Sequence, residues 1–188
     1  LAIEGAGGVA NQFTGDDVVF LLNRYFEAVG DAIEGAGGVA NQFTGDGVMA
    51  LFGLDVGIEQ GARQALRAAQ AMQAALQRLS ADLHEELASP LSLGIGIHSG
   101  PTVVGHMGRG VATYLTAVGD TVNTASRLQD QTKEYACELI LSARVARQAQ
   151  LDVTALHHAQ ITVRNRAESI DIVIVPTVQD LALPAAAA

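Results

Sequence analysis

Apolar residues recur every three or four positions in two long segments, which is the spacing of one face of an α-helix. The first segment predicts an amphipathic helix over 17–35, with Asp16 or Asp17 placed to cap it. The second predicts a helix over about 59–87, closed by Pro90. Apolar positions that define the two faces are Val18, Leu21, Leu22, Tyr25, Val29 and Ile33, then Ala65, Ala69, Met72, Leu76, Leu79 and Leu83.

Strands are predicted where short apolar runs alternate or cluster between turn residues. Asp46-Gly47 separates two such runs, 39–44 and 48–53, and is a strong signal for a tight hairpin. A strand through Leu91–Ile97 runs into the turn 98–101, and Thr102–Met107 is expected to pair back on it. The remaining predictions are strands at 113–118, 138–141, 160–163 and 170–175, a helix at 121–133 capped by Asp120, and a short helix capped by Ser142.

Helices and strands mix without regular βαβ alternation, and the two hairpins favour an antiparallel sheet. The expected fold class is therefore α+β, with a ferredoxin-like βαββαβ core and helices packed on a mostly antiparallel sheet. The 188 residues give room for one sizeable core.

Residues 2–16 (AIEGAGGVANQFTGD) are identical to residues 32–46. A repeat protein would show at least three diverged copies, whereas these are two perfect copies in different surroundings. We interpret the first copy as a recent duplication or an artefact at the amino terminus. The expected organisation is an anomalous segment 1–16 in place of the first strand, one catalytic domain over 17–178, and a tail over 179–188.

The net charge of −9, with only 11 Lys and Arg, argues against a nucleic-acid surface. A polyanionic substrate would need metal ions and a few placed arginines. The single cysteine, Cys137, has no partner for an internal disulfide and is interpreted as a small core residue.

No apolar run approaches the roughly 18 residues that a membrane span needs. The chain begins at Leu1, has no signal segment and ends in an alanine run, so we expect a piece of a longer protein. The expected location is cytoplasmic, with no membrane contact by this domain, although the parent protein could be membrane-anchored.

Three strings carry the functional hypothesis: FTGDGVMALFG (43–53), GIGIHSGPTVVG (94–105) and TAVGDTVNTASRL (116–128). Singly, Asp46 is a turn residue, and Asn123 and Arg127 are a solvated pair one helical turn apart. Together the strings resemble the class III nucleotide cyclase catalytic domain, which makes cyclic AMP or cyclic GMP. The resemblance covers about 17–176. It implies a signalling enzyme that works as a head-to-tail homodimer, with two nucleotide sites at the interface.

By this resemblance, Asp46 is one of two aspartates that hold two Mg²⁺ or Mn²⁺ ions, while the helix residues of the same site come from the other subunit. Asn123 orients the ribose, and Arg127 stabilises charge on the α-phosphate as the 3′-oxygen attacks and pyrophosphate leaves. Metal ions and a fixed guanidinium suit phosphoryl transfer, because it spreads negative charge over several oxygens. Arg164 is the expected further phosphate contact, with Arg166 as the alternative and a solvated turn pair as the other interpretation.

Base recognition follows from two more positions. Gln42 stands where the family carries its adenine-reading lysine, and Thr116 stands where it carries that lysine's partner. Thr116 fits the subclass that has Thr there and often answers to bicarbonate. Gln42 departs from both the adenine and the guanine patterns, and its amide both donates and accepts hydrogen bonds. We therefore expect ATP as substrate, with some tolerance of GTP.

The first metal aspartate is the departure from the family. Counting back 44 residues from Asp46, the family's usual spacing, reaches Ala2, so the second metal carboxylate is expected near Ala2 and is not present. One aspartate alone holds a metal ion only loosely.

Two principal hypotheses follow. The chain is an active homodimeric adenylyl cyclase whose first strand is obscured here, or it is a cyclase-homology domain that serves as a regulatory, nucleotide-binding or dimerisation module. A third, a ferredoxin-like domain that binds a small metabolite, would require all three strings to be accidental.

Overall fold

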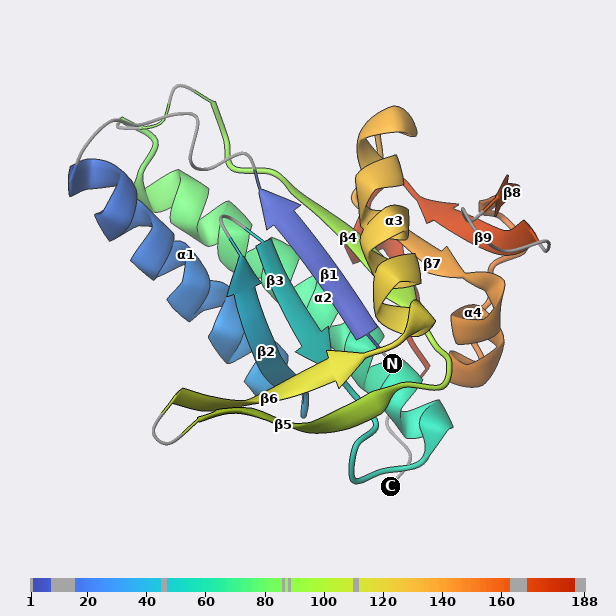
Figure 1. The fold of residues 1–188 in the computed structure, drawn as a ribbon. Coiled ribbons are helices and arrows are strands. Elements are labelled where there is room, and N and C mark those ends of the chain that lie inside the picture. The colour runs from blue at the N-terminus through green and yellow to red at the C-terminus, as the bar shows by residue number, and fades with distance from the viewer. Residues whose placement is uncertain are drawn as a thin grey trace.

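The computed structural model describes residues 2–7, 16–44, 47–85, 87, 89–109, 112–162 and 169–184 (Figure 1). The helices are α1 (Asp16–Gly35), α2 (Ile58–Asp82), α3 (Asp120–Glu134) and α4 (Ala143–Ala149), followed by a 3₁₀ turn at Val178–Asp180. The strands are β1 (Ala2–Gly7), β2 (Val39–Thr44), β3 (Gly47–Leu51), β4 (Leu93–His98), β5 (Val103–Arg109), β6 (Ala112–Val118), β7 (Leu139–Ser142), β8 (His157–Thr162) and β9 (Ser169–Val175).

Seven strands form one sheet in the order β2-β3-β1-β4-β7-β9-β8. Every neighbouring pair is antiparallel except β4 and β7. The elements β1-α1-β2-β3-α2-β4 follow one another along the chain. Within the sheet, their four strands are neighbours in the order β2-β3-β1-β4. That arrangement is the ferredoxin-like βαββαβ unit, so the predicted fold class is confirmed.

Helices cover the two faces of the sheet unequally, as Figure 1 shows. The helices α1, α2 and α4 pack on one face and bury the largest apolar cluster against it, with Tyr25, Leu66 and Ile97 among its members. Helix α3 lies alone on the other face, over two smaller clusters centred on Ala125 and on Leu128. The sheet therefore has a thick apolar layer on one side and a thin one on the other.

The strands β5 and β6 form a separate two-stranded ribbon, which lies next to β2 but outside the seven-stranded sheet (Figure 1). The prediction that Thr102–Met107 would pair back on the preceding strand was wrong. Both edges of β4 are already occupied, by β1 and by β7, so no ladder remains for β5. Pro101 adds to this, because it has no backbone N–H with which to begin a hairpin ladder.

The predicted helices and hairpin are otherwise close to those found. Helix α1 and the β2–β3 hairpin have the expected bounds within a few residues, whereas α2 ends at Asp82 rather than near 87. The chain turns back sooner because the Ser80 hydroxyl accepts a hydrogen bond from the Leu91 amide at 3.0 Å. Among the described residues, no helix combines the length and the apolar character needed to cross a membrane.

The duplicated sequence adopts two different structures. Residues 2–7 (AIEGAG) form β1, a central strand between β3 and β4. The identical residues 32–37 form the last turn of α1 and the turn after it, where Gly37 has φ of +86°. Pairing with neighbouring strands, rather than intrinsic propensity, therefore decides the conformation of the first copy.

Helix α3 lies unusually close to β4 because two β4 residues have no side chain. A Cβ atom at Gly96 would overlap the Ala125 carbonyl oxygen and the Gln129 amide nitrogen of α3. A Cβ atom at Gly94 would overlap the Thr132 hydroxyl. The two glycines therefore form a seat that sets the depth and direction of α3.

We expect Gly96→Ala to lower the free energy of unfolding by about 2–4 kcal/mol, because backbone atoms rather than a flexible side chain would have to move. The matched control is Gly105→Ala in β5, where an added Cβ meets nothing within 4 Å. It should change the free energy by no more than about 0.5 kcal/mol. Urea unfolding followed by circular dichroism measures both free energies. Equal effects of the two substitutions would contradict the claim that the β4 glycines allow the close packing of α3.

Candidate active site

The amino end of α3 is joined to the turn between β4 and β5. The Thr121 hydroxyl donates a hydrogen bond to the Pro101 carbonyl oxygen at 2.7 Å, and Thr121 is buried. Gly100 lies against the same hydroxyl, where its missing side chain leaves the necessary room. The second and third sequence strings thus meet at this point.

Gly119 precedes α3 with φ of +153° and ψ of 168°, a backbone conformation that is nearly restricted to glycine. Gly119, and not Asp120 as predicted, is the N-cap residue, so the cap position itself carries no side chain. Asp120 is instead the first helical residue, where a carboxylate is compatible with the helix dipole.

Asn123 and Arg127 lie on the outer face of α3, as the sequence predicts. The inner face is buried against the sheet and consists of Thr121, Thr124, Ala125, Leu128, Gln129 and Thr132. Asn123 is exposed and Arg127 is half-buried. Because they are four residues apart on a regular helix, they project side by side, and neither is paired with a described residue.

Arg127 borders a cavity of about 440 Å³ between α3 and the edge strand β8. Gln131 and Tyr135 follow Arg127 at four-residue intervals along the cavity wall, and Thr162 closes it at the end of β8. The sequence reasoning missed this cavity, although the four-residue repeat from Arg127 marked the helix face that lines it. The predicted Arg164, and its alternative Arg166, lie outside the described residues.

The two predicted base-reading residues lie on neighbouring elements. Gln42 is exposed on β2, just after an irregularity in the β2–β3 pairing, and is paired with Met49. Thr116 is half-buried on β6, opposite Gly105 of β5. Strands β2 and β6 contact each other, so the fold brings these two segments together from 74 positions apart in the sequence.

Asp46 lies outside the described residues, but the strands on either side of it are described. The last described pair of the β2–β3 ladder is Thr44–Gly47, and Asp46 lies between these two residues in the sequence. In the β1–β3 ladder, Gly47 pairs with Ala6, whereas Ala2 pairs with Leu51 at the other end of β1. Ala2 is thus separated from the hairpin turn by most of the strand.

This register bears on the predicted metal ions. The β1 residues beside the hairpin turn, Ala6 and Gly7, carry no carboxylate. Among the described residues, no three His, Cys, Asp or Glu side chains come together in a way that could hold a metal ion. Of the two aspartates that the resemblance implies, the described residues therefore supply none beside Gly47.

Cys137 packs at the edge of the cluster around Leu128. Burial raises the pKa of its thiol to about 11, so the thiol is protonated near neutral pH and is a poor nucleophile. Its packing agrees with the interpretation of Cys137 as a small residue at the core.

Comparisons with known proteins cover most of the chain. Residues 1–174 match the sequence model of the family described as the adenylate and guanylate cyclase catalytic domain. Adenylate cyclase 1 of Rhizobium meliloti is 30% identical over 157 residues, which are 84% of this chain and 24% of that protein. The chain thus spans about a quarter of this relative's length.

Solved structures of similar fold include the adenylyl cyclase CyaB from P. aeruginosa and the guanylyl cyclase Cya2. The first has a TM-score of 0.80 and 22% identity, and the match covers 93% of this chain and 91% of that one. The second has a TM-score of 0.79 and 26% identity, and the match covers 98% of each chain.

We expect Thr121→Val to lower the free energy of unfolding by about 1–2 kcal/mol, because it leaves the Pro101 carbonyl without its donor. Thr124→Val is the matched control on the same helix. The Thr124 hydroxyl is fully buried and has no described partner, so replacing it by a methyl group should be neutral or stabilising. Thermal and urea unfolding measure the stability of both variants. A destabilised Thr124→Val with an unaffected Thr121→Val would show that the hydrogen bond from Thr121 to Pro101 does not stabilise the protein.

Proposed function

The chain belongs to the adenylate and guanylate cyclase catalytic domain family, and on that premise we propose that it converts ATP to 3′,5′-cyclic AMP and pyrophosphate in signal transduction. One observation carries the proposal. Asn123 and Arg127 project together from a helix that two glycines and a buried hydrogen bond hold in place, and Arg127 borders an open cavity. Fixed polar groups of this kind stabilise charge that develops in a transition state.

In the proposed reaction, the 3′-hydroxyl of ATP loses its proton to solvent water, and its oxygen bonds to the α-phosphorus. The bond from the α-phosphorus to the bridging oxygen breaks, and pyrophosphate leaves. Arg127 stabilises the negative charge on the α-phosphate, and Asn123 orients the ribose through its amide. Arg164, two residues beyond the end of β8 at Thr162, contacts the phosphates.

Divalent metal ions are the expected cofactors, Mg²⁺ or Mn²⁺, two per site. Such ions neutralise phosphate charge in phosphoryl transfer. Asp46 is the residue of this chain that we propose as a ligand, and β1 supplies no carboxylate beside it. We therefore assign no step of the reaction to a metal ion.

For the nucleotide base, we propose recognition by Gln42 and Thr116. The Gln42 amide presents a donor and an acceptor, and the Thr116 hydroxyl can act as either. A charged pair would demand a fixed arrangement of hydrogen-bond donors and acceptors on the purine edge. Gln42 and Thr116 demand no such arrangement. ATP is the proposed substrate, with GTP accepted less well.

We propose a homodimer with the nucleotide sites at its interface. The β5–β6 ribbon supports it, because Val103 is 75% exposed and its cross-strand partner Val118 is 57% exposed. Met107 and Thr116 lie on the same side of the ribbon by the alternation of strand residues, and Met107 is also exposed. An apolar ribbon face that carries a base-reading residue suits a surface that a second copy covers.

The alternative function is a catalytically inactive cyclase-homology domain that acts as a regulatory or dimerisation module. The observation in its favour is the absence of a carboxylate at Ala6 and Gly7, next to the hairpin turn. A cyclic AMP assay with Mn²⁺ at high enzyme concentration separates the two functions, because only the enzyme yields product.

Replacing Arg127 by Gln should lower kcat for cyclic AMP formation about 100-fold, because it removes a guanidinium that is placed for the transition state. Arg144→Gln is the matched control, since Arg144 is exposed on α4 on the opposite face of the sheet. Product formation from ATP and from GTP with Mn²⁺, together with melting temperatures, measures the effect. Equal activity of both variants would refute the role of Arg127.

Adding a carboxylate beside the hairpin should strengthen Mn²⁺ binding. Ala6 pairs with Gly47, the residue after Asp46, so Ala6→Asp puts a second carboxylate next to the turn. Ala2→Asp is the matched control, because residue 2 is four positions before residue 6 and is therefore on the same face of the sheet. We expect Ala6→Asp, and not Ala2→Asp, to tighten Mn²⁺ binding about tenfold by electron paramagnetic resonance and to raise activity. Tighter Mn²⁺ binding by Ala2→Asp than by Ala6→Asp would instead support the position found by counting 44 residues back from Asp46.

A further inference from the structure

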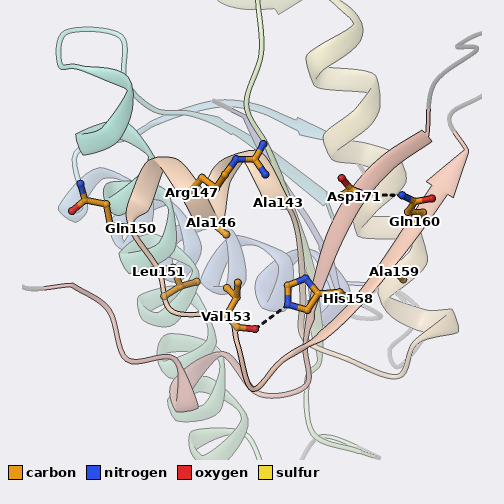
Figure 2. Close-up of a pocket in the computed structure, with 10 residues that line it drawn as sticks. All are labelled: Ala143, Ala146, Arg147, Gln150, Leu151, Val153, His158, Ala159, Gln160 and Asp171. Carbon is orange, nitrogen blue, oxygen red and sulfur yellow. Dashed lines mark hydrogen bonds between the residues drawn. The ribbon is translucent and has the colours of Figure 1, made fainter.

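A second cavity lies on the other face of the sheet, away from α3. It has a volume of about 520 Å³ and lies between α4 and the outer strands β8 and β9 (Figure 2). Its volume is within the range of sites that bind small molecules, roughly 300–1,000 Å³. The residues around it belong to no part of the proposed active site except Gln160 of β8, which borders both cavities.

The cavity forms where the short helix α4 leaves part of strands β8 and β9 uncovered. Helix α4 has only seven residues and ends at Gln150, whose φ of +58° turns the chain away. The apolar part of the lining comes from Ala143 and Ala146 of α4 and from Leu151 and Val153 after it, whereas the Ala159 side chain packs on the α3 face of the sheet. Small side chains on the α4 wall leave room for an aliphatic group.

Two opposite charges border this apolar floor without meeting each other. Arg147 projects from the last turn of α4, and no described carboxylate lies within ion-pair distance of it. Asp171 of β9 accepts a hydrogen bond from the Gln160 amide at 2.7 Å. A carboxylate has about four acceptor positions, so Asp171 retains capacity for a cationic donor.

His158 adds a directed acceptor. One ring nitrogen, Nε2, lies 2.9 Å from the Val153 carbonyl oxygen, and that oxygen can only accept, so Nε2 carries the proton. In the neutral ring, Nδ1 is then an acceptor, and Figure 2 shows that it is turned toward the cavity. The cavity therefore offers a guanidinium donor from α4, and a carboxylate and an imidazole acceptor from β9 and β8.

We propose that this cavity binds a small zwitterion of the amino-acid class with an aliphatic side chain. The carboxylate of the ligand pairs with Arg147, and its ammonium group pairs with Asp171 and Nδ1 of His158. Its side chain lies on the apolar lining that Ala146, Leu151 and Val153 provide. An anion alone would leave Asp171 repelling it, and a cation alone would leave Arg147 unpaired.

A bound ligand would also bear on the strand that enters the proposed active site. Strand β8 carries His158 in this cavity and Thr162 in the cavity beside Arg127. Ordering β8 would therefore influence the segment that follows it, which contains Arg164. This consequence rests on the proposed function, whereas binding of the zwitterion does not.

The test is a titration of the 188-residue chain with L-leucine, followed by ¹⁵N–¹H NMR. Two analogues each lack one charge: 4-methylpentanoate has no ammonium group, and 3-methylbutylamine has no carboxylate. We expect L-leucine to bind in the millimolar range or tighter, with shifts at α4, β8 and β9, and each analogue to bind about tenfold more weakly.

Matched variants test which charge of the ligand Arg147 binds and which Asp171 binds. Arg147→Gln should weaken L-leucine about tenfold and leave 3-methylbutylamine unaffected, and Asp171→Asn should weaken L-leucine while leaving 4-methylpentanoate unaffected. Arg144→Gln, three residues before Arg147 and outside the cavity, should bind L-leucine like the unaltered chain. All three positions are exposed, and melting temperatures will verify that the variants fold.

Absence of shifts up to the solubility limit of L-leucine would overturn the proposal. So would shifts that Arg147→Gln and Asp171→Asn leave unchanged, or an anion that binds as tightly as the zwitterion. Because NMR reports binding without catalysis, failure of binding is distinguishable from failure of cyclase activity.

Discussion

The close contact between α3 and β4 is the constraint on which the candidate active site depends. Gly94 and Gly96 let the helix backbone approach the sheet to a depth that no side chain would allow. Thr121 then fixes the amino end of the helix to Pro101. With position and depth both set, the direction in which Asn123 and Arg127 project follows from helical geometry alone. Two side chains that look like an ordinary solvated pair in the sequence therefore acquire a fixed place in space.

The sheet separates two cavities of different chemistry. On the α3 side, Arg127 borders a cavity whose other wall is β8. On the α4 side, Arg147 and Asp171 border a cavity that meets the same strand. Strand β8 is one edge of the sheet and, among the described strands, pairs with β9 alone, so fewer backbone hydrogen bonds hold it than hold β4 or β1. An edge strand between two cavities is a physical route by which one could influence the other.

Local patterns predicted most of the elements, because the periodicity of buried positions is a local property. The helix expected at 17–35 and the strands flanking Asp46 appear almost as predicted. The pairing of β5 was missed, because it depends on β1 and β7 occupying both edges of β4, and these strands come from distant parts of the chain. The two cavities were missed for the same reason, since their walls meet only after the strand order is set.

The duplicated segment shows why fold and activity are separable in this chain. Residues 2–7 fill the central strand position although the same six residues end a helix thirty positions later. Backbone pairing with β3 and β4 makes no demand on side-chain chemistry, so many sequences can complete the sheet. The metal binding that we propose would make such a demand beside the hairpin, where this copy has Ala6 and Gly7. Completing the fold therefore asks little of these side chains, whereas the proposed metal binding would need a residue that the fold does not select.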